Sequence, residues 1–100
     1  MEKRVAHYPL DGIQAQFETM ADLRLTRSAR FGLREMGLRL VDAWAVIRGL
    51  GVRNFYKSMT CTACPRVWQD VYRSSWRDIP LYIKFQQDDE GYFVISFKRL

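Results

Sequence analysis

Residues 55–73 read FYKSMTCTACPRVWQDVYR, and they mark the point where the spacing of apolar residues along the chain changes. Before them, apolar residues recur every three or four positions, which is typical of amphipathic helices. From Phe55 onward, runs of aromatic and branched residues are typical of strands. Helices followed by strands predict an α+β fold, in which an antiparallel sheet packs against N-terminal helices.

Four strands are predicted in the C-terminal half, because strand-like runs are separated by turn residues. They cover residues 55–60, 67–73, 81–87 and 92–99. The acidic segment 88–91 reads as a solvated turn that joins the last two strands into a hairpin. A short strand over residues 3–6 is expected at the sheet edge.

Three apolar stripes at helical spacing precede the strands and are assigned to the core. Thr26 and Ser28 suit the start of the second helix, and Gly37 suits its end. The stripes are Leu10, Ile13, Phe17 and Met20; Ala29, Leu33 and Met36; and Ala43, Trp44, Val46 and Ile47.

Length and charge limit the classes of protein to consider. The chain has 100 residues, which fits one domain over residues 1–100. No apolar run reaches the roughly 20 residues of a transmembrane helix, and the N-terminal residues lack a signal-peptide core, so we expect a cytoplasmic protein without a membrane partner. Sixteen Lys and Arg against 11 Asp and Glu give a net charge of +5, which favours a polyanionic partner such as nucleic acid.

The two cysteines form one CxxC pair, Cys61 and Cys64. A closed zinc site needs four ligands, and the single histidine, His7, is far away in the sequence. A redox CxxC normally opens a helix, whereas Pro65 and the predicted strand after it indicate a loop. We therefore interpret the cysteines as loop thiols and expect neither a metal nor another cofactor.

Alternation sorts the side chains of the last two predicted strands onto two faces. One face is apolar and should meet the helices: Leu81, Ile83, Phe85, Phe93, Ile95 and Phe97. The opposite, open face carries Tyr82, Lys84, Gln86, Tyr92, Val94, Ser96 and Lys98. Pairing of these strands would bring Tyr82 near Lys98. In the first two strands, alternation alone does not decide which residues face solvent.

Convergence of five polar residues on the open face would create a cationic surface with a phenol, an amide and no carboxylate. Arginine binds phosphate oxygens in pairs, lysine supplies compact charge, glutamine can fix a base or a phosphate, and tyrosine can stack on a base or move a proton. Such a surface suits a phosphodiester. The five residues are Lys57, Gln69, Arg73, Tyr82 and Lys98.

Cleavage of RNA without a metal requires a base for the ribose 2′-hydroxyl, stabilisation of charge on the phosphate and an acid for the leaving 5′-oxygen. His7 alone cannot perform both proton transfers. Tyrosine and lysine have ordinary pKa values of about 10, and lysines clustered around Tyr82 would lower its pKa. The alternative is a non-catalytic module whose basic face binds RNA or an acidic protein strand.

Four blocks of the chain form a further pattern: MEKR with His7 and Leu10, FYKSMT, WQDVYR and VISFK. Together they resemble the MqsR family of messenger RNA interferases, which belongs to the wider RelE-like group of bacterial toxins. The resemblance covers most of residues 55–98, and the helical half matches mainly in pattern and in TRSA. It implies a RelE-like fold. It also implies the toxin of a toxin–antitoxin system, a metal-independent, sequence-selective endoribonuclease that cleaves mRNA by attack of the 2′-hydroxyl and inhibits translation.

The resemblance also implies site residues and partners. The catalytic residues would be Lys57, Gln69, Tyr82 and Lys98, and the RNA contacts would be Arg73, Met59 and His7. The substrate would be single-stranded mRNA. The partner would be an MqsA-like antitoxin that binds zinc and DNA, so the zinc belongs to the partner and operator DNA is reached only through it. The segments CTACPR and SSWRDIP depart from the family pattern, which leaves the cleavage sequence open.

Overall fold

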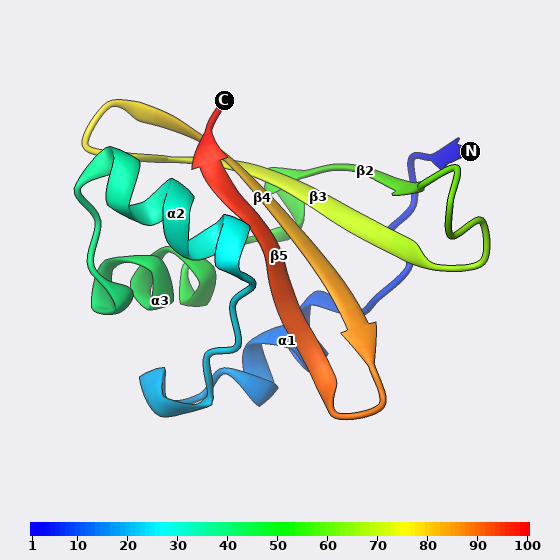
Figure 1. Cartoon of the computed structure of the whole chain (residues 1–100), viewed down its shortest axis with the longest axis horizontal. Helices are drawn as coiled ribbons and strands as arrows, with labels where there is room; N and C mark the ends of the chain where they lie inside the picture. Colours follow the sequence, from blue (N-terminus) through cyan, green and yellow to red (C-terminus); the bar gives the residue numbers. More distant parts are fainter.

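A five-stranded antiparallel sheet forms the centre of the computed structural model, which describes residues 1–100 (Figure 1). The strands pair in chain order and are β1 (Glu2–Lys3), β2 (Phe55–Thr60), β3 (Trp68–Trp76), β4 (Ile79–Asp88) and β5 (Gly91–Arg99). The helices are α1 (Leu10–Gln16), α2 (Arg27–Met36) and α3 (Leu40–Arg48), with short 3-10 turns η1 (Met20–Asp22) and η2 (Val52–Asn54). The predicted α+β architecture is confirmed. No helix is long and apolar enough to cross a membrane.

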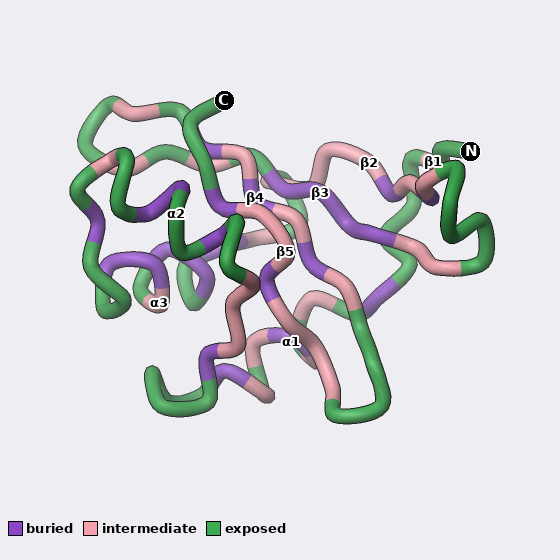
Figure 2. Tube along the Cα trace, in the orientation of Figure 1, coloured by how far each residue is buried: buried purple, intermediate pink, exposed green.

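The hydrophobic core lies between the helices and one face of the sheet. It joins the inner sides of the helices to side chains of one parity from β3, β4 and β5. Figure 2 shows buried residues along these helices and strands. The other face of the sheet is left without a covering helix, so the polar side chains of the strands gather there. The sheet side of the core consists of Tyr72, Leu81, Ile83, Phe85, Val94 and Phe97.

Helix α2 runs alongside β5, the edge strand (Figure 1). The Thr26 hydroxyl oxygen accepts a hydrogen bond from the Ala29 N–H at 3.1 Å, and Gly37 ends the helix at a φ of 72°, both as predicted. A Cβ atom at Gly32 would overlap the carbonyl oxygen of Phe97. Glycine at this position therefore allows α2 to approach β5 closely.

A β-bulge in β5 displaces side chains from the predicted alternation. The register pairs Lys84 with Ser96 and the next residue of β4 with Val94, so Ile95 is an extra residue. Val94, predicted on the open face, is fully buried in the core, while Phe93 and Ile95, predicted in the core, are only half-buried. These assignments were wrong because one extra residue inverts the parity of every residue before it.

The predicted positions of two further residues, Tyr92 and Met20, were also wrong. Tyr92, predicted on the open face, packs against the core, and its ring meets that of Tyr8 edge to face at 5.6 Å. Met20, predicted in the first helical stripe, is 44% exposed, because α1 ends at Gln16 and Met20 lies in η1. The same bulge accounts for Tyr92, since this residue also precedes Ile95.

A second bulge, in β2, decides which residues of β2 face away from the helices. Phe55 pairs with Tyr72, but Lys57 pairs with Val71, so Tyr56 is the extra residue. Tyr72 belongs to the core, whereas Val71 is buried outside the helix-side core. Lys57 therefore lies on the open face, a point that alternation alone left undecided.

The buried carboxylate of Asp70 holds the N-terminal segment against the sheet. It accepts hydrogen bonds from the backbone N–H groups of His7 (3.2 Å) and Tyr8 (2.8 Å) and from the Ser58 hydroxyl (2.5 Å). These bonds fix the chain between β1 and α1 across the helix side of the sheet, and β1 pairs with the outer edge of β2. The acid of the WQDVYR block therefore has a structural role.

Replacement of Asp70 by alanine is expected to destabilise the fold strongly. Each buried donor left without a partner costs about 1–3 kcal/mol, so the free energy of unfolding should fall by roughly 3 kcal/mol or more. Urea denaturation measures this change. The matched control, Asp89→Ala in the exposed turn between β4 and β5, should change it by less than about 0.5 kcal/mol. Equal effects of the two variants would contradict the role assigned to Asp70.

Candidate functional site

The uncovered face of the sheet, called the open face from here on, carries its side chains in three cross-strand rows. The central row is Lys57, Val71, Lys84 and Ser96; the second is Arg73, Tyr82 and Lys98; and the third is Met59, Gln69, Gln86 and Phe93. Neighbouring strands lie about 4.8 Å apart, so adjacent members of a row are in contact range. Six of the seven predicted site residues lie on this face, and His7 does not.

Lys57 in the central row is paired with an acid. Its Nζ lies 2.5 Å from Glu2 Oε1, and 18% of its side chain is exposed. The hydrogen-bonded ion pair raises the pKa of Lys57 and lowers the pKa of Glu2. This carboxylate was not expected from the sequence, which predicted a site with none. The pairing of Glu2 opposite Met59 brings it there, and only the sheet register reveals that pairing.

Aromatic rings support the cations of the second row. The Arg73 guanidinium lies 3.6 Å from the centre of the Tyr56 ring, and Lys98 Nζ lies 5.1 Å from the centre of the Tyr82 ring. Tyr82 and Lys98 are direct cross-strand partners, as predicted. Cation–π contacts hold a charge in place without using its N–H groups, which remain available to bind an anion.

Amide and apolar groups form the third row. Gln69 is 9% exposed, and its Nε2 donates a hydrogen bond to Gln86 Oε1 at 2.9 Å. Met59 is the cross-strand neighbour of Gln69, and Phe93 is the neighbour of Gln86. Oriented amides beside apolar side chains suit the edge and the face of a nucleobase. The open face therefore combines a cationic side with a side suited to a base.

The pKa of Tyr82 is raised, against the expectation that neighbouring cations lower it. Burial of the phenol raises this pKa and outweighs the opposite effects of Lys57 and Arg73. Tyr82 therefore keeps its proton at neutral pH and can donate a hydrogen bond or the proton itself. The expectation was wrong because it counted the neighbouring charges and left out desolvation.

Lys84 is an acid–base candidate that the sequence did not single out. Burial lowers the pKa of Lys84, and the charges of Lys98 and Lys57 lower it further. Its Nζ lies 6.0 Å from the centre of the Tyr82 ring. A lysine with a lowered pKa gives up its proton more readily and can then act as a base. Its position on the open face, together with two other lysines, was the feature of the sequence that could have identified it as a candidate.

His7 lies on the helix side of the sheet, away from the other predicted site residues. Its ring stacks on Trp68 at 5.4 Å, and its Nδ1 lies 2.9 Å from Lys3 Nζ. Its backbone N–H donates to Asp70, whose side chain has the core-facing parity of β3. Burial, followed by the charge of Lys3, lowers the pKa of His7.

The cysteine pair lies in the loop between β2 and β3, as predicted. The Cys64 N–H donates to Cys61 Sγ at 3.1 Å, and both thiols are free. No group of three or more His, Cys, Asp and Glu side chains is arranged to hold a metal ion. The charged groups that the open face presents are chiefly cations.

The chain is similar to known proteins over almost its full length. The family model described as "Motility quorum-sensing regulator, toxin of MqsA" matches residues 5–99. The chain belongs to the MqsR toxin family. It is 36% identical over 98 residues to the mRNA interferase toxin MqsR of Escherichia coli (strain K12), with 98% of each chain covered. The resemblance to the MqsR family is thereby confirmed, and it extends through the helical half.

The Glu2–Lys57 pair of this MqsR family member has a defined pH dependence. The pKa of Glu2 lies below its ordinary value of 4.5, and that of Lys57 lies above its ordinary value of 10.5. The ion pair therefore contributes its full stabilisation of the fold between pH 4.5 and pH 10.5, the ordinary pKa values of the two groups. The contribution is lost as pH falls through the lowered pKa of Glu2 or rises through the raised pKa of Lys57.

Replacement of Glu2 by glutamine should lower the pKa of Lys57 toward 10.5, because the hydrogen-bonded negative charge is removed. An NMR titration of the lysine Cε signals measures this shift. The matched control is Glu90→Gln, since Glu90 pairs with Arg24 at 3.3 Å in the turn between β4 and β5. The control should leave Lys57 unchanged. A Lys57 pKa that is unaffected by Glu2→Gln would contradict the pairing.

Proposed function

We propose that the chain is the toxin of a toxin–antitoxin pair, an endoribonuclease that cleaves single-stranded mRNA in a short sequence context and so inhibits translation. Family membership supports the class of activity, since the Escherichia coli relative is an mRNA interferase toxin. The observation that carries the proposal is the clustering of Lys57, Lys84 and Lys98 around Tyr82 in adjacent rows of the open face. This cluster fits the needs of phosphodiester cleavage.

The proposed reaction is attack of a ribose 2′-oxygen on the adjacent phosphorus, without a metal. The bond from the 2′-oxygen to phosphorus forms while the bond to the 5′-oxygen breaks. One proton leaves the 2′-hydroxyl and one reaches the 5′-oxygen, so the products are a 2′,3′-cyclic phosphate and a 5′-hydroxyl. Lys57 and Lys98 stabilise the negative charge that grows on the phosphate oxygens.

Lys84 and Tyr82 suit the two proton transfers. The pKa of Lys84 is lowered, so its neutral amine can accept the proton of the 2′-hydroxyl. The pKa of Tyr82 is raised, so its phenol remains protonated and can donate to the 5′-oxygen. Gln69 orients the base next to Met59, and Arg73 binds a flanking phosphate.

We infer that His7 helps to hold the N-terminal segment against the sheet and does not contact RNA. Its ring and its backbone N–H are engaged by Trp68 and Asp70 on the helix side of the sheet. In this proposal residues 1–100 act as one interferase domain, in the cytoplasm where mRNA is translated.

The proposed partner is an MqsA-like antitoxin, in line with the wording "toxin of MqsA" in the family description. The zinc-binding and DNA-binding parts belong to that partner, so the toxin reaches operator DNA only through it and modulates transcription of the shared operon. Expression of this toxin alone should arrest the growth of its host cells, because translation is inhibited. Co-expression with the protein encoded next to this chain should relieve that arrest. Failure to relieve it would contradict this pairing.

The activity is tested by incubating the purified protein with a long RNA in excess chelator and mapping the cut sites and end groups. We expect cuts at a recurrent short sequence with 2′,3′-cyclic phosphate ends. Lys57→Ala and Tyr82→Phe should each lower the rate by roughly 100-fold or more. Arg53→Gln, which removes an exposed cation outside the open face, should cut like the wild type. Intact RNA with salt-sensitive binding retained would favour a non-catalytic binding module.

The division of roles predicts different responses to arginine at two lysine positions. Arginine keeps the charge but does not release its proton, so Lys84→Arg should lower kcat by roughly 100- to 10,000-fold, while Lys98→Arg should retain most activity. In the wild type, kcat/KM should rise with pH up to the lowered pKa of Lys84. This rise should be lost in Lys84→Arg. Equal losses in the two variants would contradict Lys84 as the base.

A further inference from the structure

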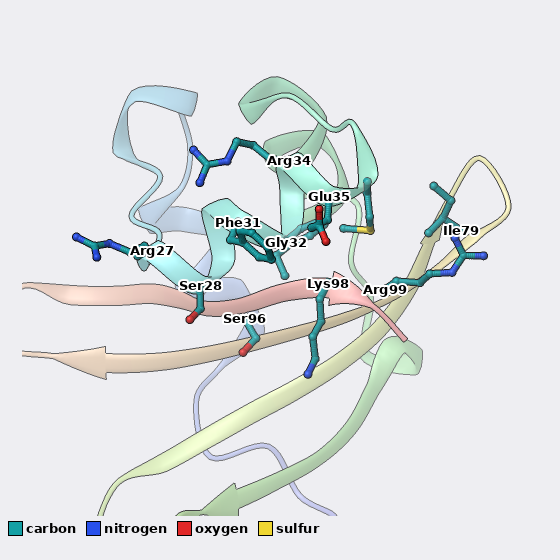
Figure 3. A pocket seen from close by; sticks show the side chains of 12 residues that line it. Arg27, Ser28, Phe31, Gly32, Arg34, Glu35, Ile79, Ser96, Lys98 and Arg99 are labelled. Atoms are coloured by element: carbon teal, nitrogen blue, oxygen red, sulfur yellow. The ribbon is translucent and has the colours of Figure 1, made fainter.

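A second basic surface adjoins the open face at the edge formed by β5. A groove of about 980 Å³ lies between α2 and the C-terminal half of β5. Figure 3 shows Phe31 and Arg34 on α2, with Ser96 and Lys98 extending from β5 away from that helix. Ser96 and Lys98 belong to both surfaces, so the groove continues the open face around the sheet edge.

The charge of the groove favours a polyanion. Four of its 12 lining residues are cations, namely Arg27, Arg34, Lys98 and Arg99, and the only acid among them is Glu35. None of the three arginines takes part in an ion pair; the ion pairs of this chain involve Arg24, Arg39 and Lys57. Their charge is therefore not neutralised within the fold.

Phe31 adds an aromatic surface between these cations. Its side chain is 56% exposed on α2, while the buried side of the helix is supplied by Ala29, Gly32 and Leu33. Phe31 follows Arg27 by four positions and precedes Arg34 by three, so both arginines flank it at helical spacing. An exposed ring beside backbone-binding cations is the arrangement on which bases of single-stranded nucleic acid stack.

We propose that this groove binds the stretch of RNA next to the cut site, with a base stacked on Phe31 and phosphates bound by Arg27 and Arg34. The inference rests on the proposed function, because Lys98 then stands between the scissile phosphate and the flanking nucleotides. An acidic protein segment would also be attracted by the arginines. The exposed ring, and the two residues that the groove shares with the open face, Ser96 and Lys98, favour RNA. The groove makes cleavage depend on RNA beyond the cut sequence itself.

The test compares a short RNA limited to the cut sequence with a longer RNA extended on both sides. Each carries a 2′-deoxynucleotide at the cut position, so that binding is measured by fluorescence anisotropy without cleavage. Phe31→Ala and the double variant Arg27→Gln/Arg34→Gln should weaken binding of the longer RNA roughly tenfold and leave the short RNA unchanged. The double variant should also reduce the salt slope by about 0.7 for each phosphate that the arginines no longer bind.

Arg30→Gln is the matched control, because Arg30 is an exposed arginine of α2 that does not line the groove. It should bind both RNAs like the wild type. Wild-type affinity of every groove variant for the longer RNA would overturn the inference, as would equal losses on both RNAs, and the groove would then be open to a protein segment. Failure of the proposed function is a separate result, namely no cleavage of either RNA in its unmodified form.

Discussion

The buried hydrogen bonds of the Asp70 carboxylate are the constraint on which the arrangement of the site depends. β1 is only two residues long and pairs with β2 over that length alone. Asp70 binds the backbone at His7 and Tyr8, and so fixes the segment that follows β1. This anchor keeps Glu2 next to Lys57. A structural acid on the helix side of the sheet thereby helps to position the ion-pair partner of a lysine on the open face.

The separation of the two sheet faces explains why acid–base groups gather where they do. The helices cover one face and take up the apolar side chains of β3, β4 and β5. The polar residues of the same strands are left on the open face, where they crowd each other and are partly desolvated. Desolvation raises the pKa of Tyr82 and lowers the pKa of Lys84. One physical effect thus shifts the two pKa values in the opposite directions that the proposed proton-transfer roles require.

Much of the fold and most of the site could be predicted from the sequence. Helical spacing, the change at Phe55 and the Thr26 and Gly37 caps anticipated the layers, and alternation anticipated the pairing of Tyr82 with Lys98. The wrong face assignments in β5 have one cause, the bulge at Ile95, which changes the parity of the strand. The bulge at Tyr56 decides the face of Lys57, which alternation had left open, and no residue type marks either bulge in the sequence.

Features that depend on long-range pairing or on desolvation could not be predicted either. Glu2 and Lys57 are 55 positions apart and meet only because β1 joins the far edge of the sheet. The direction of the Tyr82 pKa shift required the depth of its burial as well as its neighbours. Gln69, in contrast, lies on the open face, as the supposed convergence of the five polar residues required, and its role there stays a prediction.

A crystal structure with an RNA that carries a 2′-deoxynucleotide at the cut position would show directly whether the open face holds the substrate. We expect the scissile phosphate on the open face, within hydrogen-bonding distance of Lys57 and Lys98, with the sugar of the 2′ position next to Lys84. An RNA bound on the helix side of the sheet, with the open face empty, would contradict the proposed site.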